Sequence, residues 1–213
     1  MTKFSKFNYT LEELEELKNK DIVLRKAIEK IGRVDREIIK NLFQALVYAI
    51  IGQLISAKAS KTIYNRLEEK VDINPEAISK KSIEEIQALG LTFKKAEAIK
   101  NLSIQILNEE INLETLEDLE DEEVIRQLSK IKGIGRWTAE MLLINSMERK
   151  DILSFGDIAI KRGMCKVYNL ESITKETFDK YKKLYSPYGS IASIYLWNIS
   201  FIKDFNGIEN DKI

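Results

Sequence analysis

Two glycines one residue apart form the most distinctive chemical feature of this sequence. Gly133 and Gly135 lie in the segment 131–135, between two stretches with helical apolar periodicity. Glycine tolerates positive φ and lets a backbone approach another surface closely. The next helix is expected to begin near Arg136, and the first N–H groups of a helix favour an anion such as a phosphate. The segment therefore predicts either a phosphate-binding hairpin or an ordinary tight turn, and the flanking apolar pattern favours the hairpin.

An aspartate at the start of a helical pattern is the second candidate for chemistry. Asp157 opens a helix that the periodicity predicts over about 157–168. Its carboxylate can cap that helix by accepting first-turn N–H bonds, which is the commonest role of an aspartate at such a position. A fixed carboxylate can also stabilise a developing positive charge or orient an attacking water. The two roles are compatible.

The residue types that are scarce narrow the chemistry further. The 213 residues include no histidine and one cysteine, Cys165. Catalysis must therefore come from Asp, Glu, Lys, Tyr, Ser or this cysteine. An internal disulfide framework, a cysteine-ligated zinc site and an iron–sulfur cluster are excluded. We expect no cofactor and no metal ion bound by side chains.

The charge balance argues against a partner bound by bulk electrostatics, because the formal net charge is zero. The distribution along the chain is uneven, however. Acidic residues cluster near the N-terminus and between Glu109 and Glu123. Basic residues cluster around and after the glycines, at Lys130, Lys132, Arg136, Arg149, Lys150, Lys161, Arg162 and Lys166. These clusters predict either solvated helix faces of mixed charge or one basic face.

The elements that must position these residues are expected to be helices. Apolar residues recur with a period near 3.6 along most of the chain, and strand-like alternation is scarce. Thr10 with Glu13, and Ser82 with Glu85, have the spacing of capping boxes. The sequence predicts an all-α fold of about ten helices in two packed lobes. The clearest helices are expected at about 93–108, 121–130, 136–147, 157–168, 174–184 and 188–203, with two more within 35–71, broken near residues 52–53, a short one from Asn74 and one ending at Gly90.

Four separated segments resemble, in the right order, a known family. IKGIGRWTAE followed by SFGDIAIKRGM resembles the helix-hairpin-helix and Gly/Pro…Asp (HhH-GPD) signature of a DNA glycosylase superfamily. AIIGQLISAKAS upstream and SPYGSIASIYLW downstream resemble its 3-methyladenine DNA glycosylase II branch. The resemblance implies one glycosylase unit over residues 1–213, with an active-site cleft between two lobes. The first lobe is expected to comprise residues 42–148, which contain the hairpin 131–137. The second lobe is expected to comprise residues 1–41 together with residues 149–213. About 40 residues precede the matched region, so the β-rich N-terminal domain often found in the branch is not expected.

The activity that the resemblance implies is hydrolysis of the N-glycosidic bond of alkylated purines in double-stranded DNA. Asp157 matches the catalytic aspartate, which would stabilise the oxocarbenium-like transition state. Trp137 stands where relatives that also cut the strand carry a Schiff-base lysine, so base release by water alone is implied. The expected partner is duplex DNA with a damaged base. We expect a monomer without membrane association, in the cytoplasm and active on the nucleoid, because no segment has the length of a signal peptide or a membrane span.

The remaining site residues also follow from the resemblance. Trp137, Met141, Tyr188 and Trp197 match positions that line the base pocket. Leu54 matches a wedge that enters the DNA stack, although its apolar surroundings fit a core residue equally well. The predicted DNA contacts are Gln53, Leu54, Lys132, Gly133, Ile134, Gly135, Arg136 and Thr138. The carbonyl groups of Ser129, Ile131 and Ile134 are candidates for holding a monovalent cation.

Two other functions remain open at this stage. A helix-hairpin-helix unit can serve as a non-catalytic grip on DNA, but such a protein has no need of Asp157 near phosphates. A glycosylase for another base lesion is the second alternative, although Trp137 disfavours the lyase-type enzymes for oxidised bases. The missing cysteine cluster disfavours the iron–sulfur members.

Overall fold

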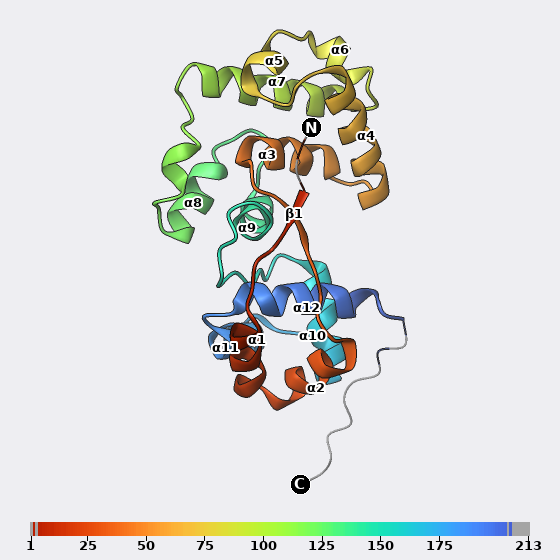
Figure 1. Cartoon of the computed structure of the whole chain (residues 1–213), viewed down its shortest axis with the longest axis vertical. Helices are drawn as coiled ribbons and strands as arrows, with labels where there is room; N and C mark the ends of the chain where they lie inside the picture. The colour runs from red at the N-terminus through yellow and green to blue at the C-terminus, as the bar shows by residue number, and fades with distance from the viewer. Residues whose placement is uncertain (1, 3, 204, 206–213) are drawn as a thin grey trace. The chain divides into compact units, whose positions relative to one another are not determined.

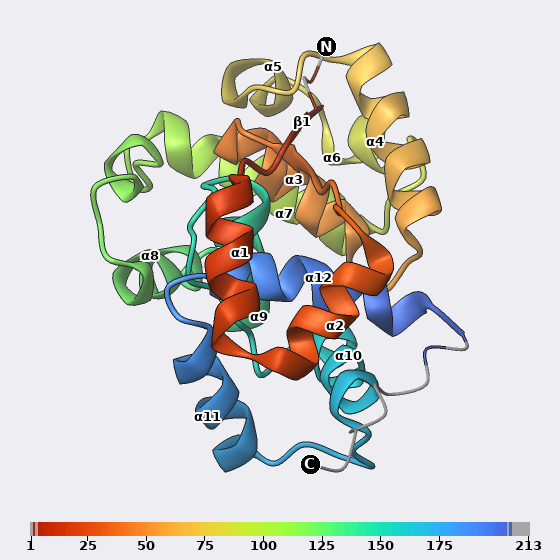
Figure 2. The same cartoon turned by 60° about the horizontal axis from the view of Figure 1, so that its bottom comes forward.

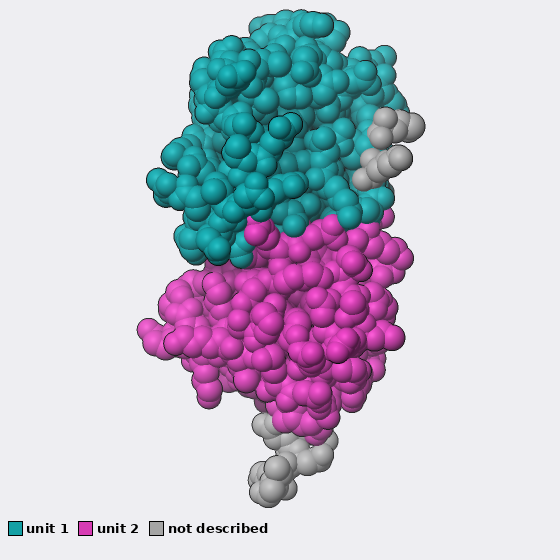
Figure 3. All heavy atoms as spheres, turned by 60° about the vertical axis from the view of Figure 1, so that its left-hand side comes forward, with its two compact units in different colours: residues 1–5, 38–147 teal, residues 6–37, 148–213 magenta. Residues whose placement is uncertain are grey.

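The computed structural model describes residues 2, 4–203 and 205. The chain divides into two compact units, coloured in Figure 3: unit 1 is Met1–Ser5 with Ile38–Met147, and unit 2 is Lys6–Glu37 with Glu148–Ile213. The sequence analysis placed these boundaries near residues 42 and 148 and assigned the first five residues to the other lobe. A two-stranded sheet pairs β1 (Phe4–Lys6) with β2 (Glu37–Ile39), and the unit boundary falls within the first strand and within the second.

Unit 1 is helical and contains the glycine hairpin (Figure 1). Its helices are α3 (Leu42–Gly52), α4 (Ala57–Lys70), α5 (Pro75–Ser79), α6 (Ile83–Gln87), α7 (Phe93–Leu107), the 3₁₀ turn η1 (Glu114–Leu116), α8 (Asp121–Leu128) and α9 (Arg136–Asn145). The sequence of α3, LFQALVYAIIG, is apolar on nearly every face, and this helix packs against α4, α7 and α9. Since an all-round apolar helix must be buried, α3 forms the core of the unit.

Unit 2 collects helices from both ends of the chain (Figure 2). These are α1 (Leu11–Lys20), α2 (Ile22–Ile31), α10 (Ile158–Tyr168), α11 (Lys175–Tyr185) and α12 (Gly189–Phe201). Nearly every residue of α12 is buried, and this helix packs against α10 and α11. Gly163 makes the α10–α12 contact possible, because a Cβ added there would lie 2.1 Å from the Leu196 carbonyl oxygen. Only glycine permits such close backbone approach.

The all-α fold class is confirmed, and each of the clearest predicted helices is present within about three residues of its predicted ends. Both capping boxes form: Thr10 accepts from the Glu13 N–H and Ser82 from the Glu85 N–H, and each glutamate returns a bond to the cap residue. Within the described residues the structure has twelve α-helices instead of about ten. The two strands were missed, because three residues are too few for alternation to be visible.

Among the described helices, none is long and apolar enough to cross a membrane.

Candidate active site and nucleic-acid interface

The glycine hairpin is a compact turn between α8 and α9. The Ile131 N–H donates to the Leu128 carbonyl at 3.0 Å, and the Ile134 N–H donates to the Ile131 carbonyl at 2.9 Å. Both isoleucine side chains are buried and anchor the turn, while Gly133 has a φ of +92° that favours glycine. Gly135 precedes α9, and none of the described residues caps this helix with a side chain. A Cβ on Gly135 would meet nothing within 4 Å. The start of α9 therefore has the open geometry of an anion site.

Acidic side chains accompany the two cations of the hairpin. Lys132 pairs with Glu97 at 3.0 Å. Arg136 pairs with Glu122 at 2.6 Å and with Glu140 at 3.0 Å. The hydrogen bonds that Arg136 donates to the Glu122 carboxylate raise the pKa of the Arg136 guanidinium. A phosphate would therefore compete with carboxylates for these cations, but exposed pairs of this kind contribute only about 0–1 kcal/mol.

Two of the residues predicted to contact DNA, Ile134 and Thr138, are buried. The side chains of Ile134 and Thr138 are buried, so only their backbone groups could reach a ligand. The Ile134 N–H is already bonded within the turn to the Ile131 carbonyl. That Ile134 and Thr138 contact DNA stays a prediction, and the burial of both side chains limits it to backbone contacts.

Leu54 projects fully into solvent. Its relative exposure is 104% and its φ is +60°, an unusual conformation for a residue other than glycine. The alternative that Leu54 belongs to the core is therefore wrong. The neighbouring Gln53 does not point into solvent alone: its Nε2 donates to the Gly133 carbonyl oxygen at 2.6 Å. The loop between α3 and α4 is thus bonded to the hairpin across 80 residues of sequence.

Lys95 is a residue of this region that the sequence analysis missed. Its Nζ donates to the Ile51 carbonyl at 2.8 Å and to the Gln53 carbonyl at 2.6 Å, at the C-terminal end of α3. Burial lowers the pKa of Lys95. No local signal in the sequence marks this contact, because Lys58, Lys94 and Lys175 also lie in the first turn of a helix. The carbonyls that Lys95 meets are 44 and 42 residues away in the chain.

Trp137 and Met141 lie one turn apart in α9, as the spacing predicted. Trp137 is 46% exposed, and Met141 is half-buried. A tryptophan that serves only as core is expected to be more deeply buried. Trp137 therefore offers an aromatic surface beside the hairpin.

Asp157 is the N-cap of α10 and is only 5% exposed. Its Oδ1 accepts the Ile160 N–H at 2.8 Å, which confirms the capping role. Its own N–H donates to the Ser154 carbonyl at 3.3 Å. Asp157 is therefore buried, with one bond to its carboxylate and one from its backbone N–H, and such a residue has the defined orientation that a group acting on a transition state requires.

Serine side chains tie the connector before Asp157 to α12. The Ser190 hydroxyl accepts the Ile152 N–H at 3.0 Å and donates to the Arg149 carbonyl at 2.5 Å. The Ser193 hydroxyl donates to the Ile152 carbonyl at 2.8 Å. Asp151 accepts the Gly189 N–H at 3.1 Å at the start of α12. The segment leading to Asp157 and the helix carrying Trp197 are therefore one bonded assembly.

The two aromatic candidates of unit 2 differ in surroundings. Trp197 is 8% exposed, and the Arg36 guanidinium lies over its ring at 4.7 Å from the centroid. The Tyr188 hydroxyl donates to the Glu16 carboxylate, and this bond raises the pKa of Tyr188 to about 12. Trp197 is thus mainly a core residue that already has a cation on one face, whereas Tyr188 is partly exposed.

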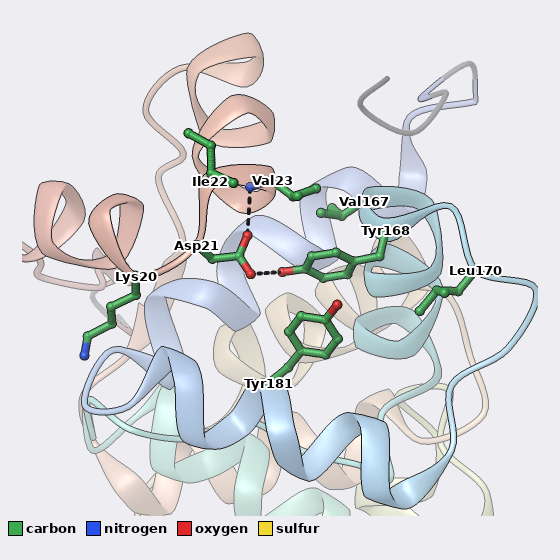
Figure 4. Close-up of a pocket in the computed structure, with 8 residues that line it drawn as sticks. All are labelled: Lys20, Asp21, Ile22, Val23, Val167, Tyr168, Leu170 and Tyr181. Carbon is green, nitrogen blue, oxygen red and sulfur yellow. Dashed lines mark hydrogen bonds between the residues drawn. The ribbon is translucent and has the colours of Figure 1, made fainter. Parts of the chain in front are cut away.

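A pocket of about 380 Å³ lies elsewhere in unit 2, where the α1–α2 junction meets α10 and α11 (Figure 4). Asp21 accepts the N–H groups of Val23 and Leu24 at 2.8 Å and the Tyr168 hydroxyl at 3.0 Å. The Tyr168 ring stacks on Tyr181 with centroids 4.2 Å apart. The pocket is at the C-terminal end of α10, opposite Asp157, and these polar groups bond to one another. We therefore assign it a structural role at the helix junction.

Unit 1 thus brings Gln53 to the hairpin and keeps Trp137 and Met141 on the adjoining helix, while unit 2 holds Asp157, Tyr188 and Trp197. That the two sets face one cleft stays a prediction. Within the described residues, no cluster of three or more His, Cys, Asp or Glu side chains could hold a metal ion. The Ile131 carbonyl accepts one hydrogen bond and keeps a second lone pair, so the monovalent-cation site also stays a prediction.

The hairpin followed by a buried, helix-capping aspartate defines a class of protein. The family model of the HhH-GPD superfamily base excision DNA repair proteins matches residues 47–187. The chain belongs to this superfamily, and the family assignment made from the four sequence segments is confirmed.

Several proteins of this superfamily are similar to the chain in sequence and in structure. The chain is 33% identical over 172 residues to DNA-3-methyladenine glycosylase 1 of Schizosaccharomyces pombe, covering 78% of this chain and 75% of that protein. The crystal structure of a DNA-3-methyladenine glycosidase from Bacillus halodurans matches with a TM-score of 0.78 and 31% identity, covering 94% of this chain and 93% of that one. A Schizosaccharomyces pombe 3-methyladenine DNA glycosylase in complex with abasic DNA also matches with a TM-score of 0.78, at 30% identity over 88% of this chain and 95% of that one.

Proposed function

We propose that this protein is a DNA glycosylase that hydrolyses the N-glycosidic bond of alkylated purines in duplex DNA. The observation that carries the proposal is Asp157, a buried and oriented carboxylate that the resemblance matches to the family's catalytic aspartate, in a chain that also has the glycine hairpin. The three relatives described above are named as 3-methyladenine DNA glycosylases or glycosidases, and these names support alkylated purines as the substrate class.

The chemistry follows from the charge that develops during bond cleavage. As the bond between C1′ and the base nitrogen lengthens, the electron pair leaves with the base and the sugar becomes oxocarbenium-like. The Asp157 carboxylate would stabilise this positive charge and orient the water that adds to C1′. Water supplies the hydroxyl at C1′, and its remaining proton goes to the carboxylate or to solvent. A purine alkylated at N3 or N7 already carries positive charge and leaves as a neutral base, so its release needs no histidine or other general acid.

Binding and base flipping fall to unit 1 in this proposal. Backbone N–H groups near Gly133 and Gly135 would contact a phosphate without regard to sequence. Leu54 would fill the gap left by the flipped base, which offsets part of the few kcal/mol that flipping costs. The exposed face of Trp137 would stack on the cationic base, an interaction of roughly 0.5–2 kcal/mol.

The absence of an amine at position 137 supports a monofunctional enzyme. Strand cutting requires a lysine that attacks C1′ and forms an imine. Lys132 pairs with Glu97, and the Lys161 ammonium lies over the Phe155 ring at 4.7 Å. The product should be an intact strand with an abasic site, cut only after alkali. Borohydride trapping of a protein–DNA adduct that disappears in Lys132→Ala or Lys161→Ala would contradict this assignment.

Duplexes that each carry one lesion test the function directly. The purified protein is incubated with duplexes containing 3-methyladenine, 7-methylguanine, hypoxanthine or ethenoadenine, and the released base is quantified by chromatography. We expect release of at least one alkylated purine and none in Asp157→Asn. Tight binding without release from any duplex would instead favour the non-catalytic helix-hairpin-helix alternative. Release confined to a base that is not alkylated would favour a glycosylase for another lesion.

The partner and location belong to the same proposal. Duplex DNA with a damaged base is the expected ligand, bound by a monomer. A cytoplasmic, nucleoid-associated enzyme would meet this substrate. Sedimentation of the protein with and without a lesion duplex checks the stoichiometry, which should be one protein per lesion.

A further inference from the structure

We infer that Lys95 is a positioning residue for base flipping: it fixes the loop that presents Leu54 and, through Gln53, joins this loop to the glycine hairpin. The inference rests on the proposed function, because a wedge matters only for a paired base in duplex DNA. Lys95 touches no DNA in this scheme and acts through the backbone of the loop.

Lys95 contacts the end of α3. The ammonium group donates to the carbonyls of Ile51 and Gln53 at 2.8 and 2.6 Å, where a helix carries its negative dipole end. A cation at this place stabilises the end of α3 and defines where the helix stops. Because Lys95 belongs to the first turn of α7, the same contact ties the start of α7 to the loop.

Gln53 links this loop to the hairpin. The Gln53 backbone accepts from Lys95, and its side chain donates to the Gly133 carbonyl at 2.6 Å. Gly133 lies in the turn proposed to bind a phosphate. Two consecutive hydrogen bonds therefore couple the position of the Leu54 loop to the position of the glycine hairpin.

Leu54 itself has an unfavourable backbone conformation. A leucine with a φ of +60° and 104% exposure gains nothing from burial and is disfavoured by its backbone. Such a residue keeps this conformation only where its surroundings determine it. Hydrogen bonds on either side of Leu54 supply that constraint. Before it, the Lys95 ammonium donates to the Gln53 carbonyl. After it, the Ser56 hydroxyl caps α4 by accepting the Ala59 N–H at 3.2 Å. A preorganised wedge avoids the entropy loss of ordering the loop when DNA binds.

The test compares Lys95→Met with a matched control in the same helix. Lys100→Met is that control, because the Lys100 ammonium also donates to a backbone carbonyl, that of Lys81, near the end of α5. Single-turnover base release is measured from a duplex with the lesion paired normally and from one with the lesion opposite an abasic site, where flipping costs less. Lys95→Met should lose about tenfold on the paired lesion and less than about twofold on the unpaired one. Lys100→Met and Lys95→Arg should stay within about twofold of wild type on both substrates.

A second experiment measures base flipping independently of base release. The fluorescence of 2-aminopurine beside the lesion rises when the stack opens, and Lys95→Met should show a smaller rise than wild type at saturating protein. Equal losses on both substrates, the same losses in Lys100→Met, or wild-type behaviour on the paired lesion would overturn the positioning role. If Lys95→Met does not fold, Gln53→Leu breaks the link to Gly133 and should show the same dependence on pairing. Failure of the wild type to release any base would refute the proposed function instead, and the fluorescence comparison would still decide the role of Lys95.

Discussion

The two units position their candidate functional groups in opposite ways. In unit 1 two side chains proposed to meet DNA are exposed, Leu54 at 104% and Trp137 at 46%. Trp137 belongs to α9, and hydrogen bonds of Lys95 and Gln53 hold the loop of Leu54. In unit 2 Asp157 is 5% exposed and its carboxylate is bonded directly to the backbone of α10. A group that must enter a DNA stack has to project, whereas a carboxylate that acts on a developing charge works best when it is fixed and shielded from water.

Both units nevertheless use helix ends for this purpose. Asp157 caps the start of α10, and Asp151 accepts the Gly189 N–H at the start of α12. In unit 1 the start of α9 has no side-chain cap among the described residues, while Lys95 occupies the end of α3. The starts of α10 and α12 are thus bonded to aspartate side chains, whereas the start of α9, with no side-chain cap among the described residues, is the one proposed to bind a phosphate. The following experiments test this contrast.

Replacement of Asp157 by asparagine should have the largest effect. Asparagine keeps a side-chain oxygen for the Ile160 N–H but removes the negative charge, so base release should fall by about 10²–10⁴-fold. Binding to a lesion duplex should be retained or tighter. Single-turnover release and fluorescence anisotropy measure the two effects separately. Retention of more than about a tenth of the wild-type rate would remove Asp157 from the catalytic role.

Gly163→Ala should reduce stability through the packing of unit 2. Its Cβ would lie 2.1 Å from the Leu196 carbonyl oxygen, so α10 and α12 must separate. We expect a loss of roughly 1–3 kcal/mol in the free energy of unfolding, measured with urea. Gly135→Ala is the matched control, because its Cβ meets open space, and it should lose less stability than Gly163→Ala, limited to the weaker N-cap preference of alanine. Equal stability of the two variants would show that the close contact is not rigid.

Gly133→Val should weaken DNA binding without sequence preference. A β-branched residue is strained at a φ of +92°, so the hairpin must change conformation. We expect about tenfold weaker binding to several unrelated duplexes at one salt concentration, measured by anisotropy. A loss restricted to particular sequences would point to base contacts, and no loss would identify the hairpin as an ordinary turn.

Leu54→Ala should have the smallest effect on the folded protein. The side chain is fully exposed, so the free energy of unfolding should change by less than about 0.5 kcal/mol. Release of a paired lesion should nevertheless slow by about tenfold, with less effect opposite an abasic site. A large loss of stability would contradict the exposed placement, and an unchanged rate on the paired lesion would contradict the wedge.

Much of the fold could be predicted because its signals are local. The capping boxes of Thr10 and Ser82, the start of a helix at Pro75 and the break after Gly52 each involve residues within about four positions of one another. The same holds for the hairpin and for the cap formed by Asp157. Hydrogen bonds and dipoles at helix ends depend on such neighbours, so a single sequence contains the information.

What only the tertiary structure decided involves residues far apart in the chain. Leu54 lies in an apolar run that fits a core helix, and its exposure follows from the end of α3 at Gly52 and from the bonds that hold the loop. Trp197 matched an aromatic pocket position but is buried, with Arg36 over its ring. Lys95 reaches the Ile51 carbonyl across 44 residues. Periodicity and capping describe how one helix forms, whereas exposure and long-range hydrogen bonds depend on how helices pack, which no local pattern specifies.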